Sequence, residues 1–314
     1  YTIERVMCVF ERDVAAPLWR HWEALNNAYE GRPTTELVVR SIPSIGNYDY
    51  VVDWVFTQKG EIHINIGATG IDAVKGVAVE NMKSPGAKEA TSSGVLIAPN
   101  LVAVHHDDYF SIRQDIDVDG PINSFVRERL TPISLPANHP RRSLWQLLPA
   151  PMISEGALTA RSGPELWRIE NPEAETALGH NPSFQIAAGS SATSLLSPDD
   201  WPQRRAAFSS NTLWITAHRP GELFAGGPYP NQSPGGTGLT SYVNGDSVIE
   251  TDIVAWYTIG FHHLTRPEDW PILPTIWHGV RLRPYGFFTN NPGLGVRRYF
   301  LDKGQEGNLP SRVQ

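Results

Sequence analysis

The sequence is short of cysteine, of charge and of long apolar runs. Cys8 is the only cysteine among 314 residues, so no disulfide can form within this chain and the redox compartment is not indicated. Charged residues make up 19%, the net charge is −7 and no basic run occurs, which makes nucleic acid and anionic membranes poor partners. No apolar stretch reaches about 18 residues, the length of a membrane-spanning helix, so we expect no membrane partner.

Glycine and proline, by contrast, are plentiful. The 27 glycines and 26 prolines favour many short strands and turns over long helices. Apolar residues make up 40%, which is enough for a sizeable core in a chain of this length. No repeat, heptad pattern or linker-like change of composition divides the sequence. We therefore expect an all-β fold in a single domain spanning residues 1–314.

One hairpin can be read directly from the pattern of side chains. Residues 50–56 and 61–68 are two β-rich runs joined by a short polar turn that ends in a glycine, which is a hairpin signal. Ile62, Ile64 and Ile66 alternate with polar or small residues, so the second strand should bury one face.

Two other regions give weaker signals. Residues 22–30 contain no proline or glycine, and we expect one or two helical turns there. Residues 130–171 are rich in proline and are expected to be irregular, with Trp145 and Trp167 as packing residues.

The stretch 105–120 reads as a strand that carries acidic and imidazole side chains. Alternate side chains of a strand point to opposite faces. Asp115 and Asp117 should therefore lie together on one side. His106 and Asp108 should share the other side with Phe110 if the strand extends that far back.

The most informative motif is Asn47-Tyr48-Asp49-Tyr50. It resembles the cofactor-forming motif of the copper amine oxidases, whose first tyrosine is oxidised in place to topaquinone. Tyr48 occupies that position. The family pattern has threonine four positions before this tyrosine, where this chain has Ser44. A four-residue motif can also be a plain turn leading into a strand, so its context decides.

Further segments carry the same resemblance through nearly the whole chain. They are residues 10–13, 18–21, 213–216, 252–257, 264–271, 286–288 and 291–292. Taken together they identify the chain as a member of the family, matching its catalytic domain. The resemblance implies that the all-β fold is a large β-sandwich.

The resemblance also implies a copper ion beside the quinone, held by three histidines. Two of them form a His-x-His pair, which a strand would place on one face, and the third comes much later. His106 and His263 match two of these ligands, but the second histidine of the pair is replaced by Asp108. Any one of these histidines could instead be an ordinary polar residue. His105 and His262 point elsewhere and are read as supporting or structural residues.

This departure leaves several outcomes open. Copper could be held by His106, Asp108 and His263. Two histidines and a carboxylate also suit non-haem iron and other harder cations, so the metal could be another one. A third outcome is that no metal binds and Tyr48 stays a tyrosine. A register shift that brings in His105 is a fourth.

A peripheral cation site, often calcium in the family, is implied by a second set of residues. It comprises Asp115, the Ile116 carbonyl, Asp117, Asp252 and the Ile253 carbonyl. Oxygen-only ligands suit a hard cation. The alternative is that these acidic residues form a solvated strand face.

The expected function is oxidative deamination of a primary amine to an aldehyde, with O2 reduced to hydrogen peroxide. Asn47 and Asp49 would help to position the Tyr48 ring. Two alternatives remain. One is an enzyme of the same fold in which a two-His-one-carboxylate metal site performs another oxidation. The other is a non-catalytic subunit of a heteromeric complex.

The upstream part of the chain suggests a partner. Tyr1–Arg5 read as the middle of a domain, with neither an initiator methionine nor a signal peptide. The family's catalytic-base aspartate and gating tyrosine lie well upstream of the cofactor tyrosine. Those segments are on a separate chain, or they were cut from a longer protein, or the amine chemistry is lost. Of these alternatives we expect a second chain to supply the segments, and two such assemblies to pair. The sequence does not indicate which amine is used or in which compartment.

Overall fold

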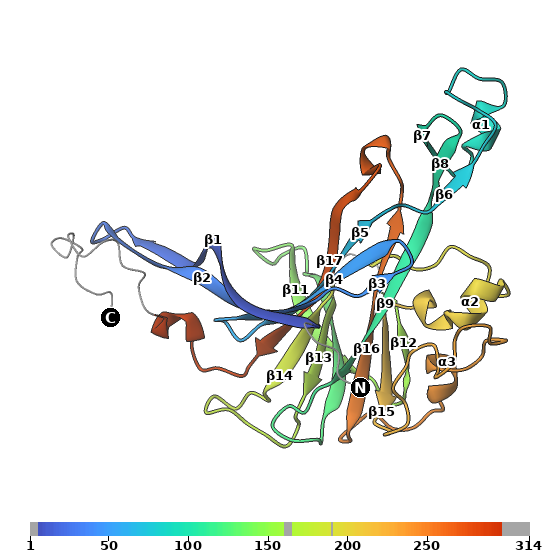
Figure 1. Cartoon of the computed structure of the whole chain (residues 1–314). Helices are drawn as coiled ribbons and strands as arrows, with labels where there is room; N and C mark the ends of the chain where they lie inside the picture. Colours follow the sequence, from blue (N-terminus) through green and yellow to red (C-terminus); the bar gives the residue numbers. More distant parts are fainter. Residues whose placement is uncertain (1–5, 160–164, 190, 297–314) are drawn as a thin grey trace.

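The computed structural model describes residues 6–159, 165–189 and 191–296, so Tyr1–Arg5 lie outside it. Strands dominate the described chain and pair antiparallel (Figure 1). The largest sheet has ten strands: β1 (Met7–Glu23), β2 (Ala28–Ser41), β4 (Tyr48–Thr57), β5 (Ile62–Gly70), β17 (Leu273–Tyr285), β14 (Ser183–Ala187), β13 (Glu165–Glu170), β10 (Ser124–Ser134) and β11 (Ser143–Pro151), with β3 (Ser44–Ile45) paired to β4.

Two smaller sheets complete the strand arrangement of the described residues. One has the order β12 (Gly156–Leu158), β15 (Leu213–Ala217), β16 (Ile253–His263) and β9 (His106–Asp115). The other has the order β6 (Val74–Gly76), β8 (Leu101–Val104) and β7 (Gly94–Ala98). The helices are short: α1 (Ala87–Ala90), α2 (Trp201–Arg205), η1 (Ala207–Ser210), α3 (Leu239–Tyr242), η2 (Pro267–Asp269) and η3 (Pro292–Gly295). In this part of the chain, no helix is long and apolar enough to cross a membrane.

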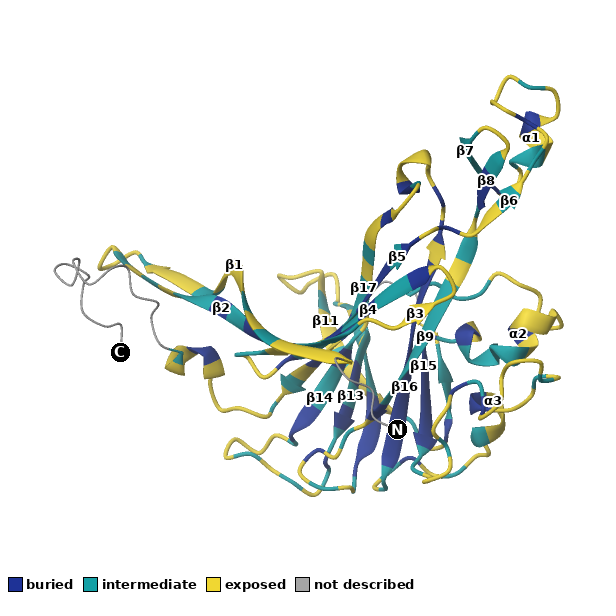
Figure 2. Cartoon of the chain, in the orientation of Figure 1, coloured by how far each residue is buried: buried dark blue, intermediate teal, exposed yellow. Residues whose placement is uncertain are grey.

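The core lies between the ten-stranded and the four-stranded sheets. Figure 2 shows buried residues concentrated on β13, β15 and β16. The large sheet contributes Ile64, Phe125 and Ile169, and the small one contributes Ile215 and Tyr257, all fully or almost fully buried. Because both inner faces supply these side chains, the fold is a β-sandwich. The prediction of an all-β sandwich is confirmed, whereas the assignment of 1–314 to one domain stays a prediction.

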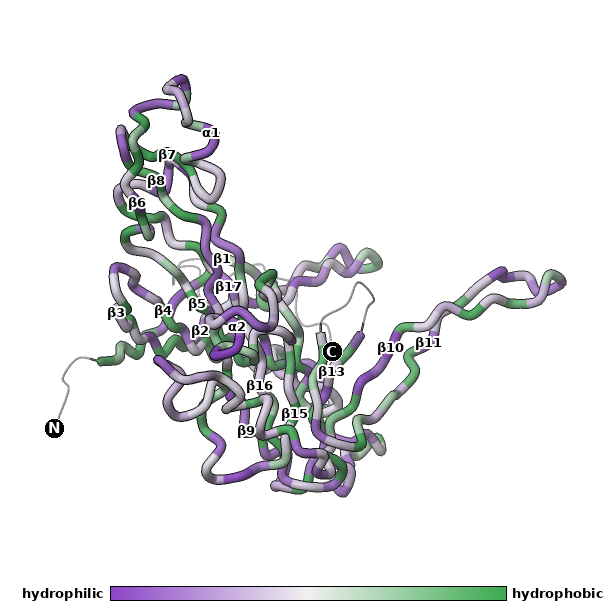
Figure 3. Tube along the Cα trace, turned by 90° about the vertical axis from the view of Figure 1, so that its right-hand side faces the viewer, coloured by the Kyte–Doolittle hydropathy of each residue, from purple (hydrophilic) through white to green (hydrophobic). Residues whose placement is uncertain are grey.

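Several hairpins extend beyond this core. In Figure 1, β1 and β2 project to one side, and the sheet of β6, β7 and β8 projects to the other with α1 at its tip. Figure 3 shows β10 and β11 leaving the body as a second arm. The hairpin read from the sequence is present as β4 and β5, with Ile64 and Ile66 buried as expected.

The expected helical turns at residues 22–30 are wrong. These residues form the end of β1, a turn and the start of β2, with Trp22 opposite Tyr29 in the register. Their rings stack with centroids 6.3 Å apart, and the Trp22 indole donates to the Asn27 side chain. Asn27 takes a φ of 48°, which asparagine tolerates and which closes the turn. Cross-strand aromatic pairing therefore outweighs weak helix propensity here.

The expectation that residues 130–171 are irregular is also wrong. Beyond Arg129, β10 and β11 form an arm in which each strand pairs only with the other. β11 is also the edge strand of the sheet. The prolines of β10 and β11 lie in this arm or on this edge. Edge positions tolerate proline because the missing N–H is not needed for a second ladder. Trp145 lies on this arm and is 68% exposed, so its assignment as a packing residue is wrong, whereas Trp167 is buried.

Truncating a buried isoleucine side chain should destabilise this sandwich. We predict that Ile64→Ala lowers the free energy of unfolding by about 2–5 kcal/mol, because it leaves a cavity in the core. Ile153→Ala removes the same atoms from a side chain that is 72% exposed and serves as the control. Urea unfolding of both variants measures the difference. Equal midpoints for the two would contradict the proposed core.

Candidate active site

Tyr48 begins β4 and is held in a tight turn. β3 precedes it, Ile45 pairs with it across the turn, and Gly46 at a φ of 64° reverses the chain. On its other side Tyr48 pairs with Gly70 of β5. A Cβ at Gly70 would lie 2.3 Å from the Asn47 carbonyl oxygen, so only glycine permits this close approach. The aromatic side chain is thereby directed inward and is 8% exposed.

Two histidines meet at the Tyr48 hydroxyl from the opposite sheet. His106 begins β9, His263 ends β16, and the register of these strands places the two residues directly opposite each other. Their ring centroids are 4.8 Å apart, and His263 Nδ1 lies 3.4 Å from His106 Nε2. The Tyr48 oxygen is 3.0 Å from His106 Nε2 and 3.4 Å from His263 Nδ1. The two nitrogens could therefore serve one metal ion, although metal binding itself stays a prediction.

The tautomer of His106 follows from its other contact. His106 Nδ1 is 2.8 Å from the Val104 carbonyl oxygen, which can only accept a hydrogen bond. Nδ1 must then carry the proton, and in a neutral ring the lone pair of Nε2 faces Tyr48. A backbone carbonyl that fixes the ring in this way is the usual support of a metal-ligating histidine.

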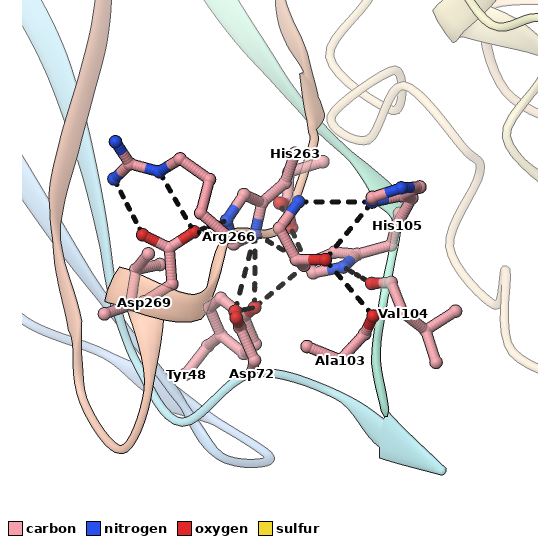
Figure 4. Close-up of polar contacts among 12 residues, drawn as sticks. Tyr48, Asp72, Ala103, Val104, His105, His263, Arg266 and Asp269 are labelled. Carbon is pink, nitrogen blue, oxygen red and sulfur yellow. Dashed lines mark hydrogen bonds and ion pairs between the residues drawn. The ribbon is translucent and has the colours of Figure 1, made fainter. Parts of the chain in front are cut away.

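His263 is supported by a buried carboxylate. Its Nε2 lies 3.6 Å from Asp269 Oδ2, and both side chains are almost completely buried (Figure 4). Burial acts to raise the pKa of Asp269, but hydrogen bonds from the Arg266 guanidinium and backbone N–H outweigh it and lower that pKa. Burial lowers the pKa of His263 against the opposing charge of Asp72. The imidazole is thus favoured in its neutral form, which is the form that can ligate a metal.

Asp108 lies close to this centre but has another partner. Its Oδ1 accepts a hydrogen bond of 2.9 Å from the Tyr50 hydroxyl, and its Oδ2 lies 3.8 Å from His106 Nε2. Oδ2 is buried and has no hydrogen-bond partner. The structure therefore places Asp108 beside His106, as expected for a residue that replaces a ligand, but its contact is longer than those at Tyr48.

The carboxylate closest to the Tyr48 hydroxyl is Asp72, which was not predicted from the sequence. Its Oδ1 accepts the Tyr48 hydroxyl proton at 2.6 Å and lies 3.6 Å from His263 Nδ1 (Figure 4). Burial, and then this hydrogen bond, raises the pKa of Tyr48 well above its usual value. A signal was available, because extending the predicted hairpin register to the Tyr48–Gly70 pair brings the residues after Gly70 beside Tyr48.

The two residues that flank Tyr48 lie at the surface side of the turn. Asn47 is exposed, and its backbone carbonyl accepts a hydrogen bond of 2.9 Å from the Ile71 N–H. Asp49 is half-buried and accepts a hydrogen bond from the Ser44 hydroxyl. These contacts stabilise the turn, so any positioning of the ring by Asn47 and Asp49 acts through the backbone.

A cavity of about 550 Å³ reaches His106 from the outer side of β9 and β16. Its lining includes His106, Asp107, Gln203, His262 and Leu264. His262 pairs with Asp107 at 2.6 Å and His105 accepts the Thr265 N–H, so both face away from Tyr48 as expected. A small molecule in this cavity would lie against a wall that includes His106.

The predicted peripheral cation residues also come together. Ligand atoms of Asp115, Asp117 and Asp252 all lie within 4.8 Å of one another. His218 lies 3.5 Å from an Asp115 oxygen and 3.3 Å from an Asp252 oxygen. Burial raises the pKa of Asp252; the charge of His218 opposes this shift, and the charges of Asp115 and Asp117 add to it. Such an accumulation of carboxylates is relieved by a cation.

With this geometry established, comparison with known proteins identifies the family. The family model for the copper amine oxidase enzyme domain matches residues 1–300. The chain therefore belongs to the copper amine oxidase family, and it corresponds to the family's enzyme domain.

Individual relatives agree with this assignment. Primary amine oxidase 2 of Arabidopsis thaliana is 39% identical over 299 residues, covering 94% of this chain and 43% of the relative. Primary amine oxidase of Klebsiella aerogenes is 38% identical over 312 residues, covering 95% of this chain and 40% of the relative. The chain thus spans less than half the length of these relatives.

A solved structure supports the same fold. The copper-containing benzylamine oxidase from Hansenula polymorpha superposes with a TM-score of 0.85 at 27% identity, covering 94% of this chain and 46% of that one. Aspergillus nidulans amine oxidase superposes with a TM-score of 0.81 at 21% identity, which bears on the fold alone.

Proposed function

We propose that this chain carries the catalytic centre of a primary amine oxidase. The observation that supports this best is the position of Tyr48, whose hydroxyl oxygen lies 3.0 Å from His106 Nε2 and 3.4 Å from His263 Nδ1. The overall reaction would convert a primary amine, O2 and water to an aldehyde, ammonia and hydrogen peroxide. The family membership of the chain and the amine oxidase names of its relatives support this activity.

The side chains around Tyr48 fit a bound metal. His106 Nε2 and His263 Nδ1 lie 3.4 Å apart, and the buried oxygens Asp72 Oδ2 and Asp108 Oδ2 have no hydrogen-bond partner. Two imidazoles and a carboxylate form an acceptable ligand set for copper, although one that is less selective than three imidazoles. His106, His263 and Asp108 are the ligands expected from the resemblance.

The metal would serve the oxygen-dependent conversion of Tyr48 to topaquinone, whose carbonyl would supply the electrophile for the amine. The chain's own residues hold and orient the reacting group. The Gly70 contact fixes the ring, Asp72 accepts a hydrogen bond from the Tyr48 hydroxyl, and the Val104 carbonyl sets the tautomer of His106. Burial of Tyr48 excludes most bulk water from its hydroxyl.

A metalloenzyme of the same fold with a different oxidation is the second candidate. The observation that favours it is the presence of two carboxylates, Asp72 and Asp108, beside only two histidines. A two-His-one-carboxylate set is typical of non-haem iron(II) enzymes. A non-catalytic subunit is the third reading, and the absence of metal uptake would favour it.

Conversion of Tyr48 can be tested directly. After treatment with copper and oxygen, we predict that the wild-type chain stains for quinone and that Tyr48→Phe does not. Tyr229→Phe alters an exposed ring and should stain like the wild type. Peptide mass spectrometry would locate the modification. An unmodified Tyr48 in copper-loaded wild-type protein would refute the amine oxidase proposal and favour the second candidate.

We further propose that Asp115, Asp117, Asp252 and the carbonyls of Ile116 and Ile253 bind a calcium ion. Calcium should raise the unfolding temperature of the wild-type chain, because only the folded state gathers these oxygens. Asp252→Asn should abolish that increase, and Asp246→Asn, which changes a carboxylate outside the group, should preserve it. A calcium effect that persists in Asp252→Asn would show that the ion binds elsewhere.

Finally, we propose that a second chain packs against this one and that two such assemblies pair. Within the described residues β1 forms an edge of the large sheet, and Met7, Val9, Val14 and Trp22 on it are exposed. Such an edge favours pairing with another chain. The isolated chain should bind apolar dyes and elute from size-exclusion chromatography as a self-associated species rather than a monomer. A monodisperse monomer that unfolds cooperatively would contradict this proposal.

A further inference from the structure

We propose that Asp72 is a metal ligand and completes, with His106 and His263, a two-His-one-carboxylate site at the Tyr48 oxygen. This inference deepens the proposed function, since it concerns the same centre, but it assigns the carboxylate to a different residue. The resemblance to the family points to Asp108, at the position of the missing histidine. The geometry points instead to the residue that follows Gly70 and Ile71.

Three ligand atoms converge on the Tyr48 oxygen. Asp72 Oδ1 is 2.6 Å from it, His106 Nε2 is 3.0 Å and His263 Nδ1 is 3.4 Å. His263 Nδ1 is also 3.4 Å from His106 Nε2 and 3.6 Å from Asp72 Oδ1. Nitrogen and oxygen atoms bound at about 2.0–2.2 Å to a common ion are separated by about 3 Å or more. The two distances from His263 Nδ1 meet this spacing.

With His263 protonated on Nε2, the cluster has more acceptors than protons. His106 Nε2 is an acceptor because Nδ1 donates to the Val104 carbonyl. Asp72 Oδ1 is an acceptor as well, and Tyr48 has a single hydroxyl proton for the two of them. If His263 binds through Nδ1, its proton lies on Nε2, which faces Asp269. A cation at the centre would satisfy the lone pairs that the single proton cannot.

Burial gives an independent reason to place a cation at Asp72. The residue is 1% exposed, and Asp72 Oδ2 is buried without a hydrogen-bond partner. Its described polar contacts are the Tyr48 hydroxyl and the imidazole of His263. A buried carboxylate is normally paired with a cation or bound to a metal. Ligand atoms of Asp72, His263 and Asp269 lie within 4.8 Å of one another. His263 belongs both to this group and to the proposed metal site.

Asp108 is the weaker candidate for the same role. Its Oδ1 is already bound to the Tyr50 hydroxyl at 2.9 Å, and its Oδ2 lies 3.8 Å from His106 Nε2. To bind the ion it would have to give up the Tyr50 contact or move farther than Asp72. We assign Asp108 the task of orienting Tyr50 next to the site, as a positioning residue rather than a ligand.

Metal binding by charge-neutral variants tests the assignment. Zn²⁺ is the probe because it has no redox chemistry, and isothermal titration calorimetry on the 314-residue chain gives its affinity. Asp72→Asn should weaken Zn²⁺ binding more than tenfold, since even supporting residues of metal sites change affinity by about 10–100-fold. Asp108→Asn should weaken Zn²⁺ binding less than Asp72→Asn does, because Asp108 is assigned a positioning role and not a place among the ligands. Asp107→Asn, on the same strand but facing His262, is the matched control.

Stability of the metal-free variants separates ligation from a structural role. If Asp72 is an uncompensated buried charge awaiting a metal, metal-free Asp72→Asn should unfold at the same temperature as the wild type or higher. If Asp72 instead forms a structural ion pair with protonated His263, the variant should unfold at a lower temperature. Copper EPR provides a second signature: Asp72→Asn should change the hyperfine coupling of bound Cu²⁺, and Asp108→Asn should leave it unchanged.

These outcomes are distinct from those of the proposed function. Tyr48→Phe should still bind Zn²⁺ through Asp72, so the site can be established in a chain that forms no quinone. If Asp108→Asn loses Zn²⁺ and Asp72→Asn keeps it, the inference is overturned while quinone formation can still stand. Equal binding by both variants and the wild type would overturn it as well.

Discussion

The register between β9 and β16 is the constraint on which the whole site depends. It places His263 opposite His106, and the same ladder continues toward the core with Tyr257 opposite Ile112. Tyr48 comes from the other sheet, where its pairing with Gly70 fixes its position along β4 relative to β5. The sandwich core is thus the element that holds the phenol against the two imidazoles. Because a strand's side chains alternate, a slip of one residue would turn His263 away and bring His262 inward.

Much of this arrangement can be read from the sequence, for identifiable reasons. The β4–β5 hairpin follows from alternating isoleucines and a glycine turn, which are local signals. His106 and His263 were found because the segments around them match a known family. The projecting arms were missed, since proline and tryptophan in residues 130–151 carry no local mark that distinguishes an edge arm from an irregular loop. Asp72 was missed because its importance depends on a β4–β5 register extended beyond the predicted hairpin.

Asp269 and Asp72 are both buried carboxylates, but they differ in their hydrogen-bond partners. Asp269 is fully buried, yet its oxygens accept from the Arg266 guanidinium and backbone N–H, and its pKa is lowered. Asp72 is equally buried and has a single phenol donor. One hydrogen bond to an ionised group contributes about 1.5–3 kcal/mol, whereas burying the charge costs several kcal/mol. Asp269 is therefore compensated within the protein, and Asp72 is not.

The surroundings of Tyr48 and Tyr50 also differ, which bears on the proposal that Tyr48 is the tyrosine that reacts. The two residues share one face of β4, their rings stack with centroids 5.9 Å apart, and each hydroxyl donates a hydrogen bond to its own aspartate. The pKa values of both tyrosines are raised, mainly by burial and further by these carboxylates. Their surroundings differ, because Tyr50 packs edge-on against Phe110, whereas Tyr48 meets His106. A cation held by the imidazoles would stabilise the Tyr48 phenolate far more than that of Tyr50, since electrostatic attraction falls with distance. Under the proposed function, these two chemically identical side chains would differ in reactivity because Tyr48 contacts the β9–β16 histidine pair.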